Sequence, residues 1–298
     1  MKNIKLIAIF LVIALGVLSL FIKNQKNTLQ DKRAIVAVTT FALYDVVSHI
    51  GGDTIKVVHI LPFGVDPHSF EPTPKLMAQI EKSKLVIYNG AGLEPWTEGF
   101  TFKSKAINMS KYVHLRHLKK SKGATDPHYW LDFANMQIVA NVVTKELIEL
   151  FPQNKKLYLH NKKEYIAMLQ KLDKIYREKL SNCRVNTVVV SHNALGYLAK
   201  NYGFQVESLT GLAPEAQPSA QDVTRIMQDI QKEGATTIFF ENFVNDSVIK
   251  RIAKDTHIHL DVFQPMGNIT KDEANAHLTY KDIMYKNLDK LSKALMCH

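Results

Sequence analysis

The chain has 298 residues, which is enough for one large or two modest α/β domains with buried cores. Its formal net charge of +10 is local: residues 1–33 carry +5, and residues 103–122 carry seven Lys or Arg and no acid. Together these two segments carry more positive charge than the whole chain, so the remaining residues have a slight net negative charge. A basic groove for nucleic acid is therefore a poor interpretation of this charge.

The N-terminus has the pattern of an export signal or a membrane anchor. Lys2 and Lys5 precede an uncharged apolar run over residues 6–22. The run ends without an Ala-x-Ala motif, so its cleavage is left open. No cysteine follows it, which predicts that the protein is not a lipoprotein. We expect residues 1–33 to be a signal peptide or an uncleaved anchor with a tether, and the protein to be periplasmic or otherwise extracytoplasmic.

A first α/β lobe is predicted over residues 34–153. Runs rich in β-branched residues, "AIVAVTT" from 34, "IKVVHILP" from 55 and "LVIYNGA" from 85, alternate with helical patterns near 43–50 and 74–83. The basic stretch 103–122 is interpreted as a solvated loop, with contact to anionic lipid or a membrane partner as the alternative. A further helix near 134–150 ends before Pro152.

A long helix is predicted over residues 154–181, which contain no Gly or Pro. Its apolar side chains recur every three or four residues, as in Tyr165, Leu169, Leu172 and Tyr176. A helix of this length would run roughly 42 Å and would connect two lobes rigidly.

A second α/β lobe is predicted over residues 182–298, from "NTVVVSH" at 186, "TTIFFE" at 236, "LDVFQP" at 260 and a helix near 219–233. The fold class is therefore α/β, with two Rossmann-like lobes of mainly parallel strands joined by the long helix. Cys183 and Cys297 are the only cysteines, and the sequence leaves their pairing open.

Three of the twelve histidines follow strands or precede helices at loop ends: His68, His128 and His192. Ligands collect outside the carboxyl ends of parallel strands, so these loops can converge on one crevice. Three imidazoles suit Zn²⁺. The first two histidines end the same tripeptide, Asp-Pro-His, in which Asp126 is interpreted as a turn cap. From composition alone, three unrelated loop histidines remain the alternative.

Four strings change that balance: "LPFGVDPHSFEPTP", "DPHYWLD", "SHNALGYLAKNYG" and "GLAPEAQPSAQDV". In this order they resemble the cluster A-I metal-binding proteins of bacterial ABC importers, solute-binding protein family 9, over residues 34–298. The resemblance implies two lobes joined by a long helix, one transition-metal ion between the lobes, and delivery of that ion to a permease in the membrane.

Carried over by position, the family's three ligands fall on His68, His128 and His192. Histidine at the third position resembles the zinc-type members, whereas manganese-type members have glutamate there. The family's fourth ligand is an Asp, but this chain has Gln264 at that position. Water is ranked first for the fourth position, Glu241 second, as ligand or as a neighbour of the ligands, and Gln264 third. Asp261 lies three residues before Gln264, and an odd separation along a strand should point its side chain to the opposite face.

The predicted function is extracytoplasmic capture of Zn²⁺ by a monomer that hands the ion to an ABC permease. The alternatives are a Mn²⁺ or Fe²⁺ carrier of the same family, an exported zinc hydrolase and a metal-binding adhesin. A hydrolase needs a general base near the metal-bound water, for which only Glu241 is placed, and the chain contains neither HExxH nor GxSxG. We therefore expect no enzymatic activity and no nucleic-acid partner.

Overall fold

A computed structural model describes residues 33–118, 123–212, 218–241 and 247–298. Ala34–His298 forms one compact unit, and the predicted leader lies outside the described residues except for Arg33. None of the helices in the described ranges is long and apolar enough to cross a membrane. The fold is accordingly described from Ala34 onward.

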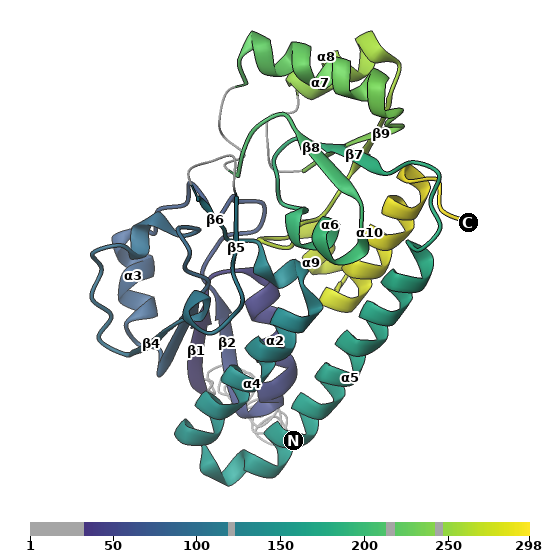
Figure 1. The fold of residues 1–298 in the computed structure, drawn as a ribbon. Coiled ribbons are helices and arrows are strands. Elements are labelled where there is room, and N and C mark those ends of the chain that lie inside the picture. The colour runs from purple at the N-terminus through teal and green to yellow at the C-terminus, as the bar shows by residue number, and fades with distance from the viewer. Residues whose placement is uncertain (1–32, 119–122, 213–217, 242–246) are drawn as a thin grey trace, which may run out of the picture. The chain divides into compact units, whose positions relative to one another are not determined.

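The first sheet contains four parallel strands in the order β2-β1-β3-β4 (Figure 1). They are β1 (Ala34–Val38), β2 (Ile55–His59), β3 (Leu85–Tyr88) and β4 (Lys105–Asn108). The helices of this half are α2 (Phe41–Gly51), α3 (Pro74–Ile80) and α4 (Phe133–Leu150), and a short antiparallel pair is formed by β5 (Arg116–His117) and β6 (Thr125–Asp126). Because side chains alternate along a strand, Val36 and Val38 enter the main core while Ala37 packs with Ile80 on the other face.

The second sheet is also parallel, in the order β10-β9-β7-β8. Its strands are β7 (Thr187–Val190), β8 (Gln205–Ser208), β9 (Thr237–Phe240) and β10 (His259–Val262). Its helices are α6 (Gly196–Tyr202), α7 (Ala220–Glu233), α8 (Ser247–Thr256), α9 (Lys271–Asn275) and α10 (Tyr280–Ala294). Val189 faces α7 and α8, whereas Val188 and Val190 face the main core. The predicted α/β class with two parallel sheets is confirmed.

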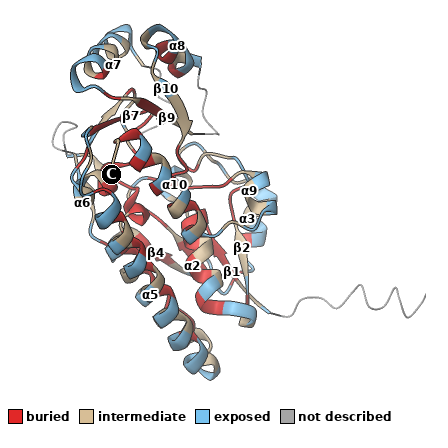
Figure 2. Ribbon diagram, turned by 90° about the vertical axis from the view of Figure 1, so that its right-hand side faces the viewer, coloured by how far each residue is buried: buried red, intermediate tan, exposed pale blue. Residues whose placement is uncertain are grey.

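The long helix α5 (Lys155–Lys179) runs beside both halves and packs against α2, α4 and α10 (Figure 1). Its fully buried side chains include Leu169, Leu172 and Tyr176. One apolar core continues from the first sheet through this helix to the second (Figure 2). The exact division into lobes at 34–153 and 182–298 stays a prediction, since these parts share that core.

The two cysteines form a disulfide. Cys183, just beyond α5, is bonded to Cys297 at the end of the chain, with an S–S distance of 2.03 Å. The chain end is therefore tied to the start of the second half, a pairing that the sequence had left open.

The interpretation of residues 103–122 as a loop is wrong in part, because β4 lies inside this stretch and Ile107 is buried in the core. Because lysines surround the apolar residue Ile107 in the sequence, the pattern did not reveal this short edge strand. Lys105 Nζ lies 2.5 Å from Glu146 and 2.9 Å from Glu149, and Lys103 pairs with Glu81 at 2.8 Å. These two bases are therefore neutralised by acids of the same half. Lys119, Lys120 and Lys122 lie outside the described residues.

Replacing Tyr280 by Phe is expected to lower the free energy of unfolding by about 1–2 kcal/mol. The buried Tyr280 hydroxyl donates to the Trp130 carbonyl at 2.7 Å and so links α10 to the loop that carries His128. Denaturant unfolding measures the loss. Tyr112→Phe is the control, since that ring is 47% exposed and should leave stability unchanged. Equal stability of both variants would contradict the expected role of this bond.

Candidate metal centre

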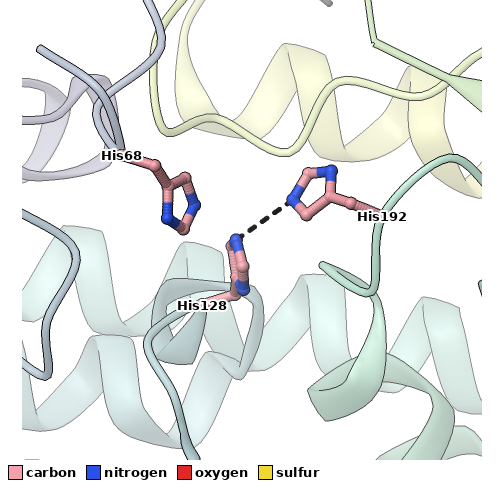
Figure 3. A group of neighbouring side chains, drawn as sticks. All are labelled: His68, His128 and His192. Carbon is pink, nitrogen blue, oxygen red and sulfur yellow. Dashed lines mark hydrogen bonds between the residues drawn. The ribbon is translucent and has the colours of Figure 1, made fainter. Parts of the chain in front are cut away.

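The three histidines predicted from sequence lie together. His68 belongs to the loop after β2, His128 to the loop after β6, and His192 to the loop after β7. One ring nitrogen from each lies within 4.8 Å of the other two, and Figure 3 shows the rings around a common space. Ring centroids are 5.4 Å apart for the first two residues and 5.2 Å apart for the last two. This is the one such group among the described His, Cys, Asp and Glu residues.

The space between the rings is small and shielded. His128 is 2% exposed and His192 is 3% exposed, while His68 is partly exposed at the rim. The space between the rings measures about 10 Å³, which admits one ion or one water molecule. Its lining consists of the three histidines with Asp66, Pro67, Trp130, Glu241, Pro265, Gly267 and Asn268.

The two Asp-Pro-His tripeptides adopt the same turn. The amide of His68 donates to Asp66 Oδ1 at 2.9 Å, and the amide of His128 donates to Asp126 Oδ1 at 3.1 Å. The aspartate two residues earlier thus fixes each histidine backbone, and proline removes conformational freedom between them. The repeated tripeptide therefore forms the same turn twice, and each copy places one imidazole at the site. The interpretation of Asp126 as a turn cap agrees with this geometry.

A carboxylate also orients the His128 ring. Asp126 Oδ1 lies 2.9 Å from Nδ1 of His128, so Nδ1 carries the proton and Nε2 offers its lone pair to the cavity. Asp126 Oδ2 accepts from Arg116 Nη1 at 2.8 Å. Tyr197 of α6 donates to the Asp126 carbonyl at 2.9 Å and accepts from the Arg116 amide at 2.9 Å. Sequence reasoning missed both partners: Arg116 was counted only as part of a basic loop.

His192 is held in a similar way. Glu241, just after β9, places Oε1 against Nδ1 of His192, which leaves Nε2 directed at the cavity. Burial lowers the pKa of His192, but the Glu241 carboxylate more than offsets this, so the pKa is raised. For His68, burial and the two neighbouring imidazoles lower the pKa to about 2, which keeps this ring neutral.

The Nε2 atoms of His128 and His192 are 3.3 Å apart (Figure 3). This contact is a hydrogen bond that needs a proton on one of the two atoms, and because both rings direct Nδ1 at a carboxylate, a metal cation between the two Nε2 atoms can take the place of that proton. Tetrahedral Zn²⁺ with Zn–N bonds of about 2.0–2.1 Å places its nitrogen ligands about 3.3 Å apart. The spacing therefore suits a zinc ion bound by these two nitrogens.

Gln264 and Asp261 are used elsewhere. The Gln264 side chain donates to Glu273 at 2.9 Å and accepts from the Met266 amide at 3.0 Å, and it does not line the histidine cavity. Asp261 pairs with Lys290 at 2.8 Å. The segment that follows Gln264 does reach the site, because Trp130 Nε1 donates to the Pro265 carbonyl at 2.6 Å.

A two-sheet α/β protein with three convergent imidazoles, two of them oriented by carboxylates, belongs to the class of metal-binding proteins. The family model described as "Zinc-uptake complex component A periplasmic" matches residues 36–294. The chain therefore belongs to this family.

Individual relatives agree with this assignment. The chain is 31% identical over 291 residues to the "High-affinity zinc uptake system protein ZnuA" of Bacillus subtilis (strain 168), covering 92% of this chain and 91% of that protein. It is 31% identical over 313 residues to the "Metal ABC transporter substrate-binding lipoprotein SsaB" of Streptococcus sanguinis, covering 99% of each. Among solved structures, the Zn(II)-bound ZnuA-like domain of Streptococcus pneumoniae AdcA is similar with a TM-score of 0.76 and 27% identity, covering 88% of this chain and 99% of that one.

Proposed function

We propose that this protein captures Zn²⁺ outside the cytoplasm and delivers it to an ABC permease for uptake. The observation that carries this proposal is the convergence of three imidazoles on one small space, with the Nε2 atoms of His128 and His192 3.3 Å apart. His68 is the third ligand. Membership of the zinc-uptake family and similarity to a relative named for zinc uptake support zinc as the cargo.

Zinc is favoured over manganese by the donor set. Imidazole nitrogens suit Zn²⁺, whereas Mn²⁺ prefers oxygen ligands. The carboxylates of Asp126 and Glu241 are held against histidine Nδ1 atoms rather than free to coordinate, and Asp66 Oδ1 accepts from the His68 amide. A Mn²⁺ or Fe²⁺ carrier of the same family is the alternative.

For the fourth position we propose water. Glu241 has one oxygen against Nδ1 of His192, so we assign it to orienting that ring and to lowering the net charge of the bound ion. The bonds of the Gln264 side chain to Glu273 and to the Met266 amide make it the least suitable candidate. An exchangeable water suits a carrier that must release its cargo.

Transport rather than catalysis is the activity that we assign. A hydrolase would need a free general base beside the metal-bound water, but of the two acids that line the cavity, Glu241 is paired with His192 and Asp66 accepts from the His68 amide. We further propose that the protein acts as a monomer, without nucleic acid. SsaB is named a lipoprotein, and for this chain we propose export directed by the apolar segment within residues 1–33.

Release requires that one side of the site opens. His68 and His128 belong to one half, and His192 and Glu241 to the other. Because one apolar core and α5 join the halves, we propose that docking on the permease moves the His192 and Glu241 loops by a small tilt rather than by wide closure.

Calorimetric titration of the full chain with Zn²⁺ and with Mn²⁺ tests the function. We expect one zinc ion per chain, bound more tightly than about micromolar and more tightly than manganese, because scavenging demands high affinity. Failure to bind either ion would overturn the carrier function. If manganese bound more tightly than zinc, the carrier function would stand, but the cargo would be manganese instead of zinc.

Replacing Glu241 by Gln is expected to weaken zinc binding about tenfold, because the amide orients His192 less firmly and removes a negative charge near the ion. X-ray absorption of the zinc-bound chain is the second measurement. Three nitrogens and one oxygen should be seen in both the parent and the variant if water is the fourth ligand. Loss of the oxygen in Glu241→Gln would instead make this residue the ligand. Glu178→Gln, a change at an exposed residue of α5, is the control.

A further inference from the structure

The end of the molecule at which the strands of the first sheet begin is remote from the histidines. All four strands are parallel, so they start at this end and direct their carboxyl ends at the metal site. The start of α5 lies at the same end, because the Tyr158 hydroxyl is 2.7 Å from Oγ1 of Thr54, directly before β2. Ile55 of β2 is in register with Ala34, the first residue of β1. The first turns of α5 form the lower end of the molecule in Figure 1.

Exposed lysines gather at this end, and none of them forms an ion pair with another described residue. They are Lys56 of β2, Lys84 just before β3, and Lys155 and Lys156 at the start of α5. Nearby, the Glu149 carboxylate is already paired with Lys105 at 2.9 Å, and Asp53 is exposed. Lysines therefore outnumber unpaired acids, which gives this end a positive potential that attracts an anionic surface.

Two leucines are exposed beside these lysines. Leu157 and Leu159 are each 40% exposed, on either side of the buried Tyr158, and they are two of the four large apolar side chains that are exposed in the described part of the chain. Side chains of a helix lean toward its N-terminus, so both leucines point to the end at which α5 begins. Figure 2 shows that the first turns of this helix are largely exposed. Lysines next to exposed leucines are typical of a surface that lies on a membrane.

The chain also connects this end to an apolar segment. The uncharged apolar run ends at Ile22 and β1 begins at Ala34, so eleven residues connect the two. Eleven residues reach at most about 40 Å when fully extended. An apolar run inserted in a bilayer therefore keeps the start of β1, and with it the start of α5, within that distance of the lipid headgroups. Chain length and charge thus point to the same occupant for this surface.

We propose that this end of the protein rests on the anionic surface of a bilayer. The four lysines pair with lipid phosphates, and Leu157 and Leu159 enter the headgroup layer. Because the histidines lie at the carboxyl ends of the same strands, this contact directs the metal site toward the solution. That consequence for metal capture rests on the proposed function, whereas the lipid contact itself does not. A contact made by a few lysines is weak and reversible, so docking on a permease can replace it.

Co-sedimentation with lipid vesicles tests the contact. Ala34–His298 is a compact unit with its own apolar core, so it folds and is used here without the apolar run. We expect saturable binding to vesicles of phosphatidylglycerol and phosphatidylcholine in equal parts, and none to phosphatidylcholine alone. Raising the ionic strength should weaken the binding, because salt screens exposed charges. Equal binding to both kinds of vesicle overturns the proposal. Absence of binding to the mixed vesicles also overturns it and leaves an acidic protein as the occupant.

Charge reversal at the start of α5 locates the contact. Lys155→Glu together with Lys156→Glu should weaken binding to the mixed vesicles at least about twentyfold, since each lysine near an anionic surface contributes about fivefold. The matched control is Lys171→Glu together with Lys174→Glu, the same change in charge about 24 Å farther along the same helix. This control should weaken binding less than about threefold. Equal losses in the two variants would indicate general attraction of a basic protein and overturn the proposal. Zinc affinity should be retained in both, which separates this test from that of the proposed function.

The leucines and the full chain provide two further measurements. Leu157→Ser together with Leu159→Ser should weaken binding to the mixed vesicles about fivefold without any change in charge, and unchanged binding would rule out entry of the leucines. The full chain is then placed in nanodiscs of the same two lipid compositions. Amides at residues 155–159, in the first turn of α5, should exchange hydrogen more slowly in the anionic discs than in the neutral ones, because the lipid shields them from water. Equal exchange in both kinds of disc overturns the contact in the full chain.

Discussion

Replacing His128 by Ala is expected to lower zinc affinity at least about hundredfold. This ring is 2% exposed, its Nδ1 is held by Asp126, and its Nε2 lies 3.3 Å from Nε2 of His192. Its loss leaves two ligands, too few for a tight zinc site, and a water cannot restore the orientation that the carboxylate provides. Competition with a chelator of known affinity measures the change, because direct titration saturates when binding is tight.

The matched control is His160→Ala on α5. His160 is exposed and pairs only loosely with Glu164 at 3.5 Å, so its removal should leave both zinc affinity and stability as they are. Circular dichroism of the His128 variant checks that the fold is kept. Retention of parent affinity by a folded His128→Ala would rule out the proposed site, whatever the other two histidines do.

Replacing Asp126 by Asn is expected to weaken zinc binding about 10–100-fold and to lower the free energy of unfolding by about 2 kcal/mol. Asp126 is fully buried and uses one oxygen for Nδ1 of His128 and the other for Arg116. An amide supplies only one acceptor, so its NH₂ group would face a donor, either the guanidinium or the imidazole. The site loses a negative charge as well as a well-ordered ring.

Two measurements separate these effects. Chelator competition reports zinc affinity, and denaturant unfolding without metal reports stability. Asp53→Asn, a change at an exposed residue, is the control for both. Arg116→Lys should lower stability less than Asp126→Asn, because lysine keeps the charge beside the carboxylate but loses the guanidinium geometry. An Asp126→Asn variant that is less stable but binds zinc normally would show that this carboxylate supports the fold alone.

The sequence was most informative where a pattern is local. Short runs rich in β-branched residues predicted β1, β2, β3, β7, β9 and β10, and the absence of Gly and Pro together with apolar residues every three or four positions predicted α5. The strands β4 and β8 were missed because their sequences, KAIN and QVES, contain few apolar residues, unlike the equally short strands β3 and β7. The sequence showed the positive charge of residues 103–122. It did not show that Lys105 would pair with Glu146 and Glu149 of α4.

The doubled Asp-Pro-His and the position of His192 after a buried strand made the three histidines candidates, and the resemblance of four longer strings to a metal-binding family selected them as ligands. Each Asp-Pro-His turn is closed by an aspartate two residues away. The loops of His68 and His192 follow strands that the apolar pattern reveals, whereas the loop of His128 follows the two-residue strand β6, which the sequence did not predict. What only the tertiary structure decided is how the rings are oriented. Asp126 meets Arg116 and Tyr197, Glu241 meets His192, and Gln264 turns to Glu273, because these pairings depend on how two sheets pack about one core. Side-chain direction across such distances is set by packing, which sequence spacing does not encode.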